Sequence, residues 1–294
     1  MMRLAGIVVP VVTPLREHGV DEDATARLVD SLIRAGIHGL FVAGTTGEGP
    51  LLNVEERRTL LRAVRRETKG RVPVLAGIGA ASTEETRRLS QWAADDGADV
   101  VVAMTPYFFA FRQSELQAHL EAVIRSSKLP VALYEIPQRT GNRLAVETVR
   151  GLMHHERLIS VKDSSGDMGH FLRLLQTVRT DVTVLIGDDA LILPAMAAGA
   201  AGAVSGLANV CPSVLVGLYN AMSSGNLSLA RQLQRQVITG QDALSVESSI
   251  PAALKAALAA QGIAVGDPKP PLAPLSAEAT ERFCRALTKA GLLP

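Results

Sequence analysis

The stretch Leu158-Ile159-Ser160-Val161-Lys162-Asp163-Ser164 places a lysine at the end of a short apolar run. Such a run is typical of a buried parallel strand, and the polar, glycine-containing segment after it is typical of a turn. A buried ammonium is costly unless it is paired or loses its proton. A neutral lysine amine in a desolvated pocket can attack a ketone to form a Schiff base. The alternative is a strand-end lysine that reaches solvent or pairs with a carboxylate, such as Asp163 or Asp188.

Seven similar runs alternate with segments of helical period along the chain. The eight predicted strands are residues 7–12, 39–43, 72–76, 99–104, 131–134, 158–162, 182–186 and 202–205. Helices are expected to begin near Asp21, Val54, Thr83, Gln113, Val146, Asp167 and Asp188. Eight apolar strands with helices between them indicate parallel pairing, and the count favours an α/β fold of the closed (β/α)8 TIM-barrel type over a doubly wound sheet.

Local signals mark several helix ends. Ser82 and Glu85 have the spacing of a capping box, in which the serine caps the helix and the glutamate returns the bond. Gly36, Gly97 and Gly199 each follow a helical segment and precede a strand, as C-terminal caps do.

After the eighth strand only helical period remains, interrupted by the proline-rich segment 267–274. We therefore predict a barrel over residues 1–211 and a helical appendage over residues 212–294 that packs on the barrel.

The composition favours a soluble, cytoplasmic protein. Of the 294 residues 47% are hydrophobic, and 30 basic residues balance 29 acidic ones, so no charged surface for nucleic acid or membrane is expected. Cys211 and Cys284 lie far apart in no metal-ligand spacing, which favours free thiols in a reducing compartment. We see neither a leader segment nor an apolar run long enough to span a membrane.

In a TIM barrel, catalysis takes place at the carboxyl ends of the strands, so the residues directly after each strand are the candidates for a site. The second strand leads into Gly44-Thr45-Thr46-Gly47-Glu48-Gly49, where exposed backbone N–H groups and two hydroxyls can bind a carboxylate. The alternative for this segment is a simple turn.

Polar side chains also end the later strands. Tyr134 ends the fifth strand and can move protons, and Arg139 comes after it and can hold a carboxylate. Lys162 ends the sixth, Asp188 follows the seventh and Ser205 follows the eighth. Because these groups fall at one end of one barrel, Schiff-base chemistry on Lys162 becomes the favoured interpretation. The aspartates Asp163 and Asp188 have the alternative role of helix caps or partners of the lysine.

Four segments together resemble the dihydrodipicolinate synthase / N-acetylneuraminate lyase family, and the similarity runs nearly from end to end. These segments are Gly44-Thr45-Thr46-Gly47-Glu48, Tyr134-Glu135-Ile136-Pro137-Gln138-Arg139-Thr140-Gly141, Val161-Lys162-Asp163-Ser164-Ser165-Gly166-Asp167 and Gly202-Ala203-Val204-Ser205-Gly206.

The resemblance implies a class I aldolase mechanism with pyruvate or another 2-keto acid. Lys162 would form the Schiff base, Tyr134 would shuttle protons, and Thr45, Thr46 and the backbone near Val204 would hold the carboxylate, in a loop shaped by Gly44 and Gly47. The iminium serves as the electron sink, so neither a metal nor another cofactor is expected. The partners it implies are small molecules and further copies of the chain, as a homodimer or homotetramer.

The resemblance also bears on the substrate. Arg139 matches the position that grips aspartate semialdehyde in the synthase, which favours a synthase over a sugar-acid lyase. Phe108, however, stands where the synthase has the second tyrosine of its proton relay, and a phenylalanine cannot relay a proton. Tyr107 and Ser205 remain secondary candidates. The alternatives are a 2-keto-3-deoxy acid or 4-hydroxy-2-oxoglutarate aldolase and a non-catalytic, ligand-binding barrel.

Two further functions are not expected. Gly49, Val54 and Arg57 replace the serine and two histidines of the lysine feedback site in many bacterial synthases, so inhibition by lysine is not predicted. The histidines show no metal-ligand spacing with a carboxylate; they are His18, His38, His119, His154, His155 and His170.

Overall fold

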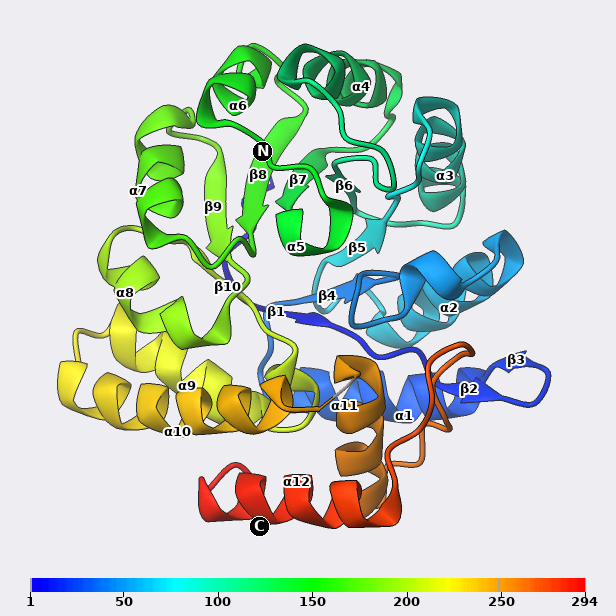
Figure 1. The fold of residues 1–294 in the computed structure, drawn as a ribbon, viewed down its shortest axis with the longest axis vertical. Coiled ribbons are helices and arrows are strands. Elements are labelled where there is room, and N and C mark those ends of the chain that lie inside the picture. The colour runs from blue at the N-terminus through cyan, green and yellow to red at the C-terminus, as the bar shows by residue number, and fades with distance from the viewer. Residues whose placement is uncertain (1, 248, 294) are drawn as a thin grey trace.

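A computed structural model describes residues 2–247 and 249–293, whose centre is a closed barrel of parallel strands surrounded by helices (Figure 1). All eight predicted strands and the barrel are confirmed, with ends that differ by a residue or two. Neighbours around the barrel follow the order β1-β10-β9-β8-β7-β6-β5-β4, and β4 closes onto β1. The barrel strands are β1 (Gly6–Pro10), β4 (Gly39–Val42), β5 (Val74–Gly77), β6 (Val100–Met104), β7 (Val131–Glu135), β8 (Leu158–Asp163), β9 (Thr183–Ile186) and β10 (Gly202–Val204).

The helices predicted between the strands are present, and each begins within a residue of the predicted position except α8, which begins four residues after Asp188. They are α1 (Glu22–Arg34), α2 (Val54–Thr68), α3 (Thr83–Asp95), α4 (Gln113–Ser126), α6 (Val146–Leu152), α7 (Met168–Thr177) and α8 (Ile192–Ala197). Ser82 caps α3 by accepting from Glu85 N at 3.2 Å, but the Glu85 carboxylate pairs with Arg88 rather than returning the bond. The three predicted C-terminal glycines all have positive φ, as left-handed helix ends require.

The C-terminal segment is helical, as predicted. It comprises α9 (Pro212–Ser223), α10 (Leu227–Ser245), α11 (Ile250–Ala260) and α12 (Ala277–Lys289). In Figure 1, α9 and α10 lie side by side and α12 lies at the outer edge. Because α9 also packs on β1, it takes the place of the eighth barrel helix, and the division of the chain after residue 211 stays a prediction.

Several short elements escaped the sequence patterns. They are the hairpin β2 (Leu15–Arg16) and β3 (Gly19–Val20), the helix α5 (Pro137–Thr140), and the 3₁₀ turns η1 (Gly49–Leu51), η2 (Asp189–Leu191) and η3 (Leu207–Asn209). Two to four residues are too few for a hydrophobic period to show. Near Asp188, where the sequence predicts the start of a helix, the structure has the 3₁₀ turn η2, which leads into α8.

Two apolar clusters hold the fold together. The larger fills the layer between barrel and helices, and the smaller fills the barrel interior, where alternate residues of the strands point inward. The interior cluster consists of Leu4, Val8, Phe41, Leu75, Val100, Val102, Ala132, Tyr134, Ile136, Ile159, Leu185 and Val204. Tyr134 is its polar member, at the carboxyl end of β7.

The cysteines and the helix lengths agree with the expectations from composition. Both cysteines are free thiols, Cys211 buried and Cys284 half-buried. None of the helices that the structure describes is long and apolar enough to cross a membrane.

Candidate active site

Lys162 and Tyr134 are direct neighbours across the β7–β8 ladder. Both side chains point into the barrel, where Lys162 is 7% exposed and Tyr134 is 5% exposed. The Lys162 Nζ lies 3.9 Å from the centroid of the Tyr134 ring and 5.3 Å from that of Phe41. Two aromatic rings therefore lie against the amine, at a place that is largely closed to water.

The Tyr134 hydroxyl lies close to the polar groups of Thr45, Lys162 and Ser164, which act on its pKa. Burial acts to raise the pKa of Tyr134, but the charge of Lys162 and these polar groups outweigh it, so that the pKa lies below its usual value. A phenol with a lowered pKa gives up and recovers a proton more readily at neutral pH.

Gly187, directly after β9, leaves the space that Lys162 occupies. A methyl group on its Cα would overlap Ser164 Oγ and lie 2.9 Å from Lys162 Cε. A larger residue there would displace the amine from the tyrosine, so the glycine is part of the site although it carries no reactive group.

The loop after β4 brings its hydroxyls to the same end of the barrel. Thr45 and Thr46 are half-buried, and the loop's glycines lie against backbone or rings. A Cβ on Gly44 would come 2.7 Å from the Phe41 ring, and one on Gly47 would come 2.7 Å from Val11 O. The loop is therefore pressed onto the barrel rim.

A cavity of about 420 Å³ opens above this loop. Thr45 and Thr46 line one side, the exposed Arg139 of α5 lines another, and the segment from Leu244 to Pro251 at the end of α10 and start of α11 contributes further residues that the structure describes. The volume suits a small organic acid rather than a polymer. The predicted pair of hydroxyls and guanidinium thus share one cavity.

Val204, in the eighth barrel strand β10, and Ser205, directly after this strand, are both buried. Val204 belongs to the interior cluster, and the buried Ser205 contacts Asp189 and accepts a hydrogen bond from Ala208 N. Burial raises the pKa of Asp189 to about 6, against the hydrogen bonds from Ser205 and Leu207 N. Asp188 caps η2 by accepting from Ala190 N at 3.0 Å, which is the structural role that we considered for it.

A buried acid–base group lies behind the reactive residues. Asp163 pairs with His170 at 3.1 Å, rather than serving Lys162. Burial acts to lower the pKa of His170, but Asp163 and the Leu144 carbonyl outweigh it and raise that pKa. Glu135, fully buried, accepts from Leu144 N at 2.9 Å, and burial raises the pKa of its carboxyl to about 7.

The secondary candidates lie at the rim. Phe108 is 87% exposed with a φ of 83°, and its ring stacks edge-on against the exposed Phe109. Tyr107 is half-buried and lies near Arg57, whose pKa is lowered by burial and raised in part by that tyrosine. Tyr107 and Phe108 therefore lie outside the group that Lys162, Tyr134 and Thr45 form.

Comparison with known proteins identifies the relationship. The model of the dihydrodipicolinate synthetase family matches residues 3–290. The chain belongs to this family. A 4-hydroxy-tetrahydrodipicolinate synthase of Methanopyrus kandleri is 36% identical over 99% of this chain and 98% of its own. An uncharacterized DapA-like lyase of Halobacterium salinarum is 38% identical over 99% and 95% of the two chains.

A solved structure gives the same result. A prophage protein of E. coli from the dihydrodipicolinic acid synthase family, in complex with pyruvate, superimposes with a TM-score of 0.94 at 31% identity, over 98% of this chain and 99% of that one. Family and fold are thus as the motifs predict, and the chain is an enzyme of the class I aldolase type, like its synthase and lyase relatives.

The sequence did not point to four residues that shape this site. Phe41 and Ser164 contact Lys162 or Tyr134, Gly187 makes space for them, and Lys255 acts from a distant helix. Of these four residues, only Gly187 had a signal in the sequence, because it directly follows a strand at the end of the barrel where catalysis takes place.

Lys255 forms a buried ion pair with the active-site loop. Its Nζ lies 2.7 Å from Glu48 Oε1 and donates to Asp267 O at 2.9 Å, while Glu48 Oε2 accepts from Lys269 N. The two charged side chains are 2% and 0% exposed. Burial lowers the pKa of Lys255, and Glu48 partly offsets this. The pair therefore fastens the Thr45–Thr46 loop to α11.

We predict that breaking this pair destabilises the enzyme. Glu48→Gln leaves a buried ammonium without its counter-charge and should lower the free energy of unfolding by about 3–5 kcal/mol, as should Lys255→Met. The double variant should lose clearly less than the sum of the two. Urea unfolding measures all three, with Glu281→Gln at the exposed Arg285 pair as the control, expected to cost about 1 kcal/mol or less. Additive losses would contradict the coupling.

We also predict a pH effect that depends on Glu135. Because its pKa is raised from 4.5 to about 7, the folded state binds its proton more tightly than the unfolded state. The resulting stability is complete below pH 4.5 and is lost as the pH rises to 7. Glu135→Gln should flatten the fall in unfolding free energy across this range, whereas the exposed Glu147→Gln should not. Urea titrations between pH 5 and pH 8 test this, and parallel curves for the Glu135 variant and the wild type would disprove it.

Proposed function

We propose that this enzyme forms a Schiff base between Lys162 and pyruvate and condenses it with aspartate semialdehyde, as a 4-hydroxy-tetrahydrodipicolinate synthase. The observation that supports this proposal most directly is that the Lys162 amine lies beside the Tyr134 hydroxyl and Thr45 in the barrel interior. The names of several relatives, such as the Methanopyrus synthase, support the choice of reaction. The pyruvate complex of the related prophage protein supports the choice of first substrate.

The chemistry begins at the ketone. The neutral amine of Lys162 attacks the carbonyl carbon of pyruvate, and Tyr134 passes protons so that the carbinolamine oxygen leaves as water. Thr45, Thr46 and the backbone near Val204 hold the carboxylate. The iminium then takes up the electron pair when the methyl group loses a proton, which gives an enamine without a metal or other cofactor.

The second substrate approaches this enamine from the 420 Å³ cavity, which shares Thr45 with the surroundings of Tyr134. The enamine carbon attacks the aldehyde carbon, whose oxygen takes up a proton. The amino group of the semialdehyde then adds to the iminium carbon and displaces the Lys162 amine, which closes the ring of the product and frees the lysine. Arg139, on the cavity wall, pairs with the carboxylate of the aldehyde through its planar fork of N–H donors.

A second candidate is cleavage of a 4-hydroxy-2-keto acid by the same Schiff-base chemistry run in reverse. Phe108 favours it, because the side chain lacks the hydroxyl of a proton relay. The Halobacterium relative, which is named a lyase, is compatible with either direction.

The assembly of the enzyme, its location in the cell and its response to lysine are proposals as well. The exposed Phe108 and Phe109 form an apolar pair at the rim, which supports an assembly of several copies, as a dimer or tetramer. The free thiols fit a cytoplasmic location. Gly49, Val54 and Arg57, which replace the serine and two histidines of the lysine feedback site, fit an enzyme that lysine does not inhibit.

We expect borohydride reduction in the presence of pyruvate to attach one reduced pyruvyl group to Lys162, located by peptide mass spectrometry. Lys162→Ala should give no adduct, while exposed Lys128→Ala should react like the wild type. Tyr134→Phe should lower kcat by about 10²- to 10⁴-fold, because a positioned proton carrier is lost. A wild type without an adduct would eliminate both catalytic proposals and leave the ligand-binding barrel.

The two reactions are separated by their substrates. We expect product from pyruvate with aspartate semialdehyde, and Arg139→Ala should raise the KM for the semialdehyde by about 10-fold or more without reducing the pyruvate adduct. Coupled dehydrogenase assays and mass spectrometry measure the two effects. Cleavage of a 4-hydroxy-2-keto acid without any condensation product would replace the synthase with the aldolase.

A further inference from the structure

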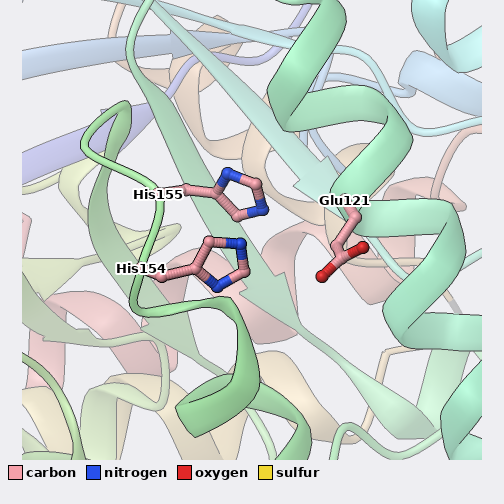
Figure 2. A group of neighbouring side chains, drawn as sticks. All are labelled: Glu121, His154 and His155. Carbon is pink, nitrogen blue, oxygen red and sulfur yellow. The ribbon is translucent and has the colours of Figure 1, made fainter.

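Three potential metal ligands lie together far from Lys162. They are Glu121 of α4 and the adjacent His154 and His155, in the loop between α6 and β8, and we call them the His–His–Glu cluster. One ligand atom from each lies within 4.8 Å of the others. Figure 2 shows one nitrogen of each imidazole facing the Glu121 carboxylate.

The histidines are held for binding by their own surroundings. His154 bonds through Nδ1 to Gly151 O at 2.8 Å, which leaves its Nε2 free as a ligand atom. His155 Nε2 is buried and has no hydrogen-bond partner among the residues that the structure describes. A buried ring nitrogen without a partner is costly, and a bound cation would satisfy it.

The loop that carries the histidines is fixed by Arg179. The guanidinium donates to the carbonyls of Met153, His155 and Leu158, the His155 bond being 3.0 Å. The two imidazole rings lie against each other with centroids 3.9 Å apart and their planes at 39°. The backbone of the loop is therefore held in place before any ion arrives.

Charge at the cluster also suits a cation. The Glu121 carboxylate places a negative charge beside the two imidazoles. The competing partner of Glu121 is Arg125, at 3.7 Å and 68% exposed. Such a loose surface pair contributes little and gives way at little cost.

We propose that the His–His–Glu cluster binds a divalent late transition metal, with Zn²⁺ as the ion tested. Two imidazoles and a carboxylate with water as the fourth ligand match tetrahedral zinc. Zinc–ligand bonds of about 2.1 Å at tetrahedral angles place neighbouring ligand atoms about 3.4 Å apart. The present separations, which reach at most 4.8 Å, therefore close by about 1.4 Å or less through χ rotation.

The site is structural, because its place in the fold separates it from the reaction. His155 precedes the first residue of β8, whereas Lys162 lies near the last, so the two sites lie at opposite ends of the barrel. A bound ion would fasten the α6–β8 loop to α4. Residues at the amino-terminal end of such barrels serve stability.

The test is zinc binding by the full-length, chelator-treated protein, followed by isothermal titration with ZnCl₂ and by the absorption spectrum with Co²⁺. We expect one ion per chain, a tetrahedral Co²⁺ spectrum and a higher Tm with zinc. Glu121→Gln and His155→Gln should each weaken binding by about 10-fold or more. Exposed His18→Gln, in the β2–β3 hairpin, should bind like the wild type.

The variants also distinguish a loss of zinc binding from a loss of the fold. Glu121 lies on the surface of a helix, so Glu121→Gln should retain the circular dichroism spectrum and the pyruvate adduct of the wild type while losing zinc. Absence of stoichiometric binding, or equal binding by wild type and both cluster variants, would overturn the proposal. Loss of binding in His18→Gln would place the ion elsewhere and overturn it as well.

Discussion

The register between β7 and β8 is the constraint on which the active site depends. It sets Tyr134 opposite Lys162 and Glu135 opposite Asp163, so that one pair points into the barrel and the next points away from it. A slip of one residue would exchange these faces and bury the carboxylates where the amine and phenol now stand. The closed barrel prevents such a slip, because every strand is held on both sides.

The sequence predicts this arrangement well where its signals are periodic. Eight apolar runs with helices between them are enough for the barrel, and the polar residue at each strand end is enough for Lys162, Tyr134 and Thr45. The rest depends on contacts between distant segments. Ser164 and Gly187 acquire their roles only when β8 and β9 are paired, and α5 is too short to leave a period. Likewise Glu121 meets His154 and His155 only after α4 and α6 pack together.

The Glu48–Lys255 pair explains why the C-terminal helices accompany the barrel. The loop that carries Thr45 and Thr46 contains Ala43 and Glu48 in left-handed conformations, which cost energy in residues other than glycine. Surrounding contacts must hold such a loop, and the buried lysine of α11 supplies one from outside the barrel. The helical appendage thus lines the cavity and also fixes the shape of its floor.

The buried polar groups divide into two kinds according to what surrounds them. Around Lys162, aromatic rings and hydroxyls hold the amine and phenol close together. Around Glu135, Asp163 and His170, backbone groups and neighbouring side chains take up most of the hydrogen bonds. The first arrangement suits chemistry with a substrate, because its hydrogen-bonding capacity can be redirected. The second suits rigidity, because it holds the ends of β7 and β8 behind the reactive pair. Reactivity at Lys162 therefore depends on a neighbouring layer that does not react.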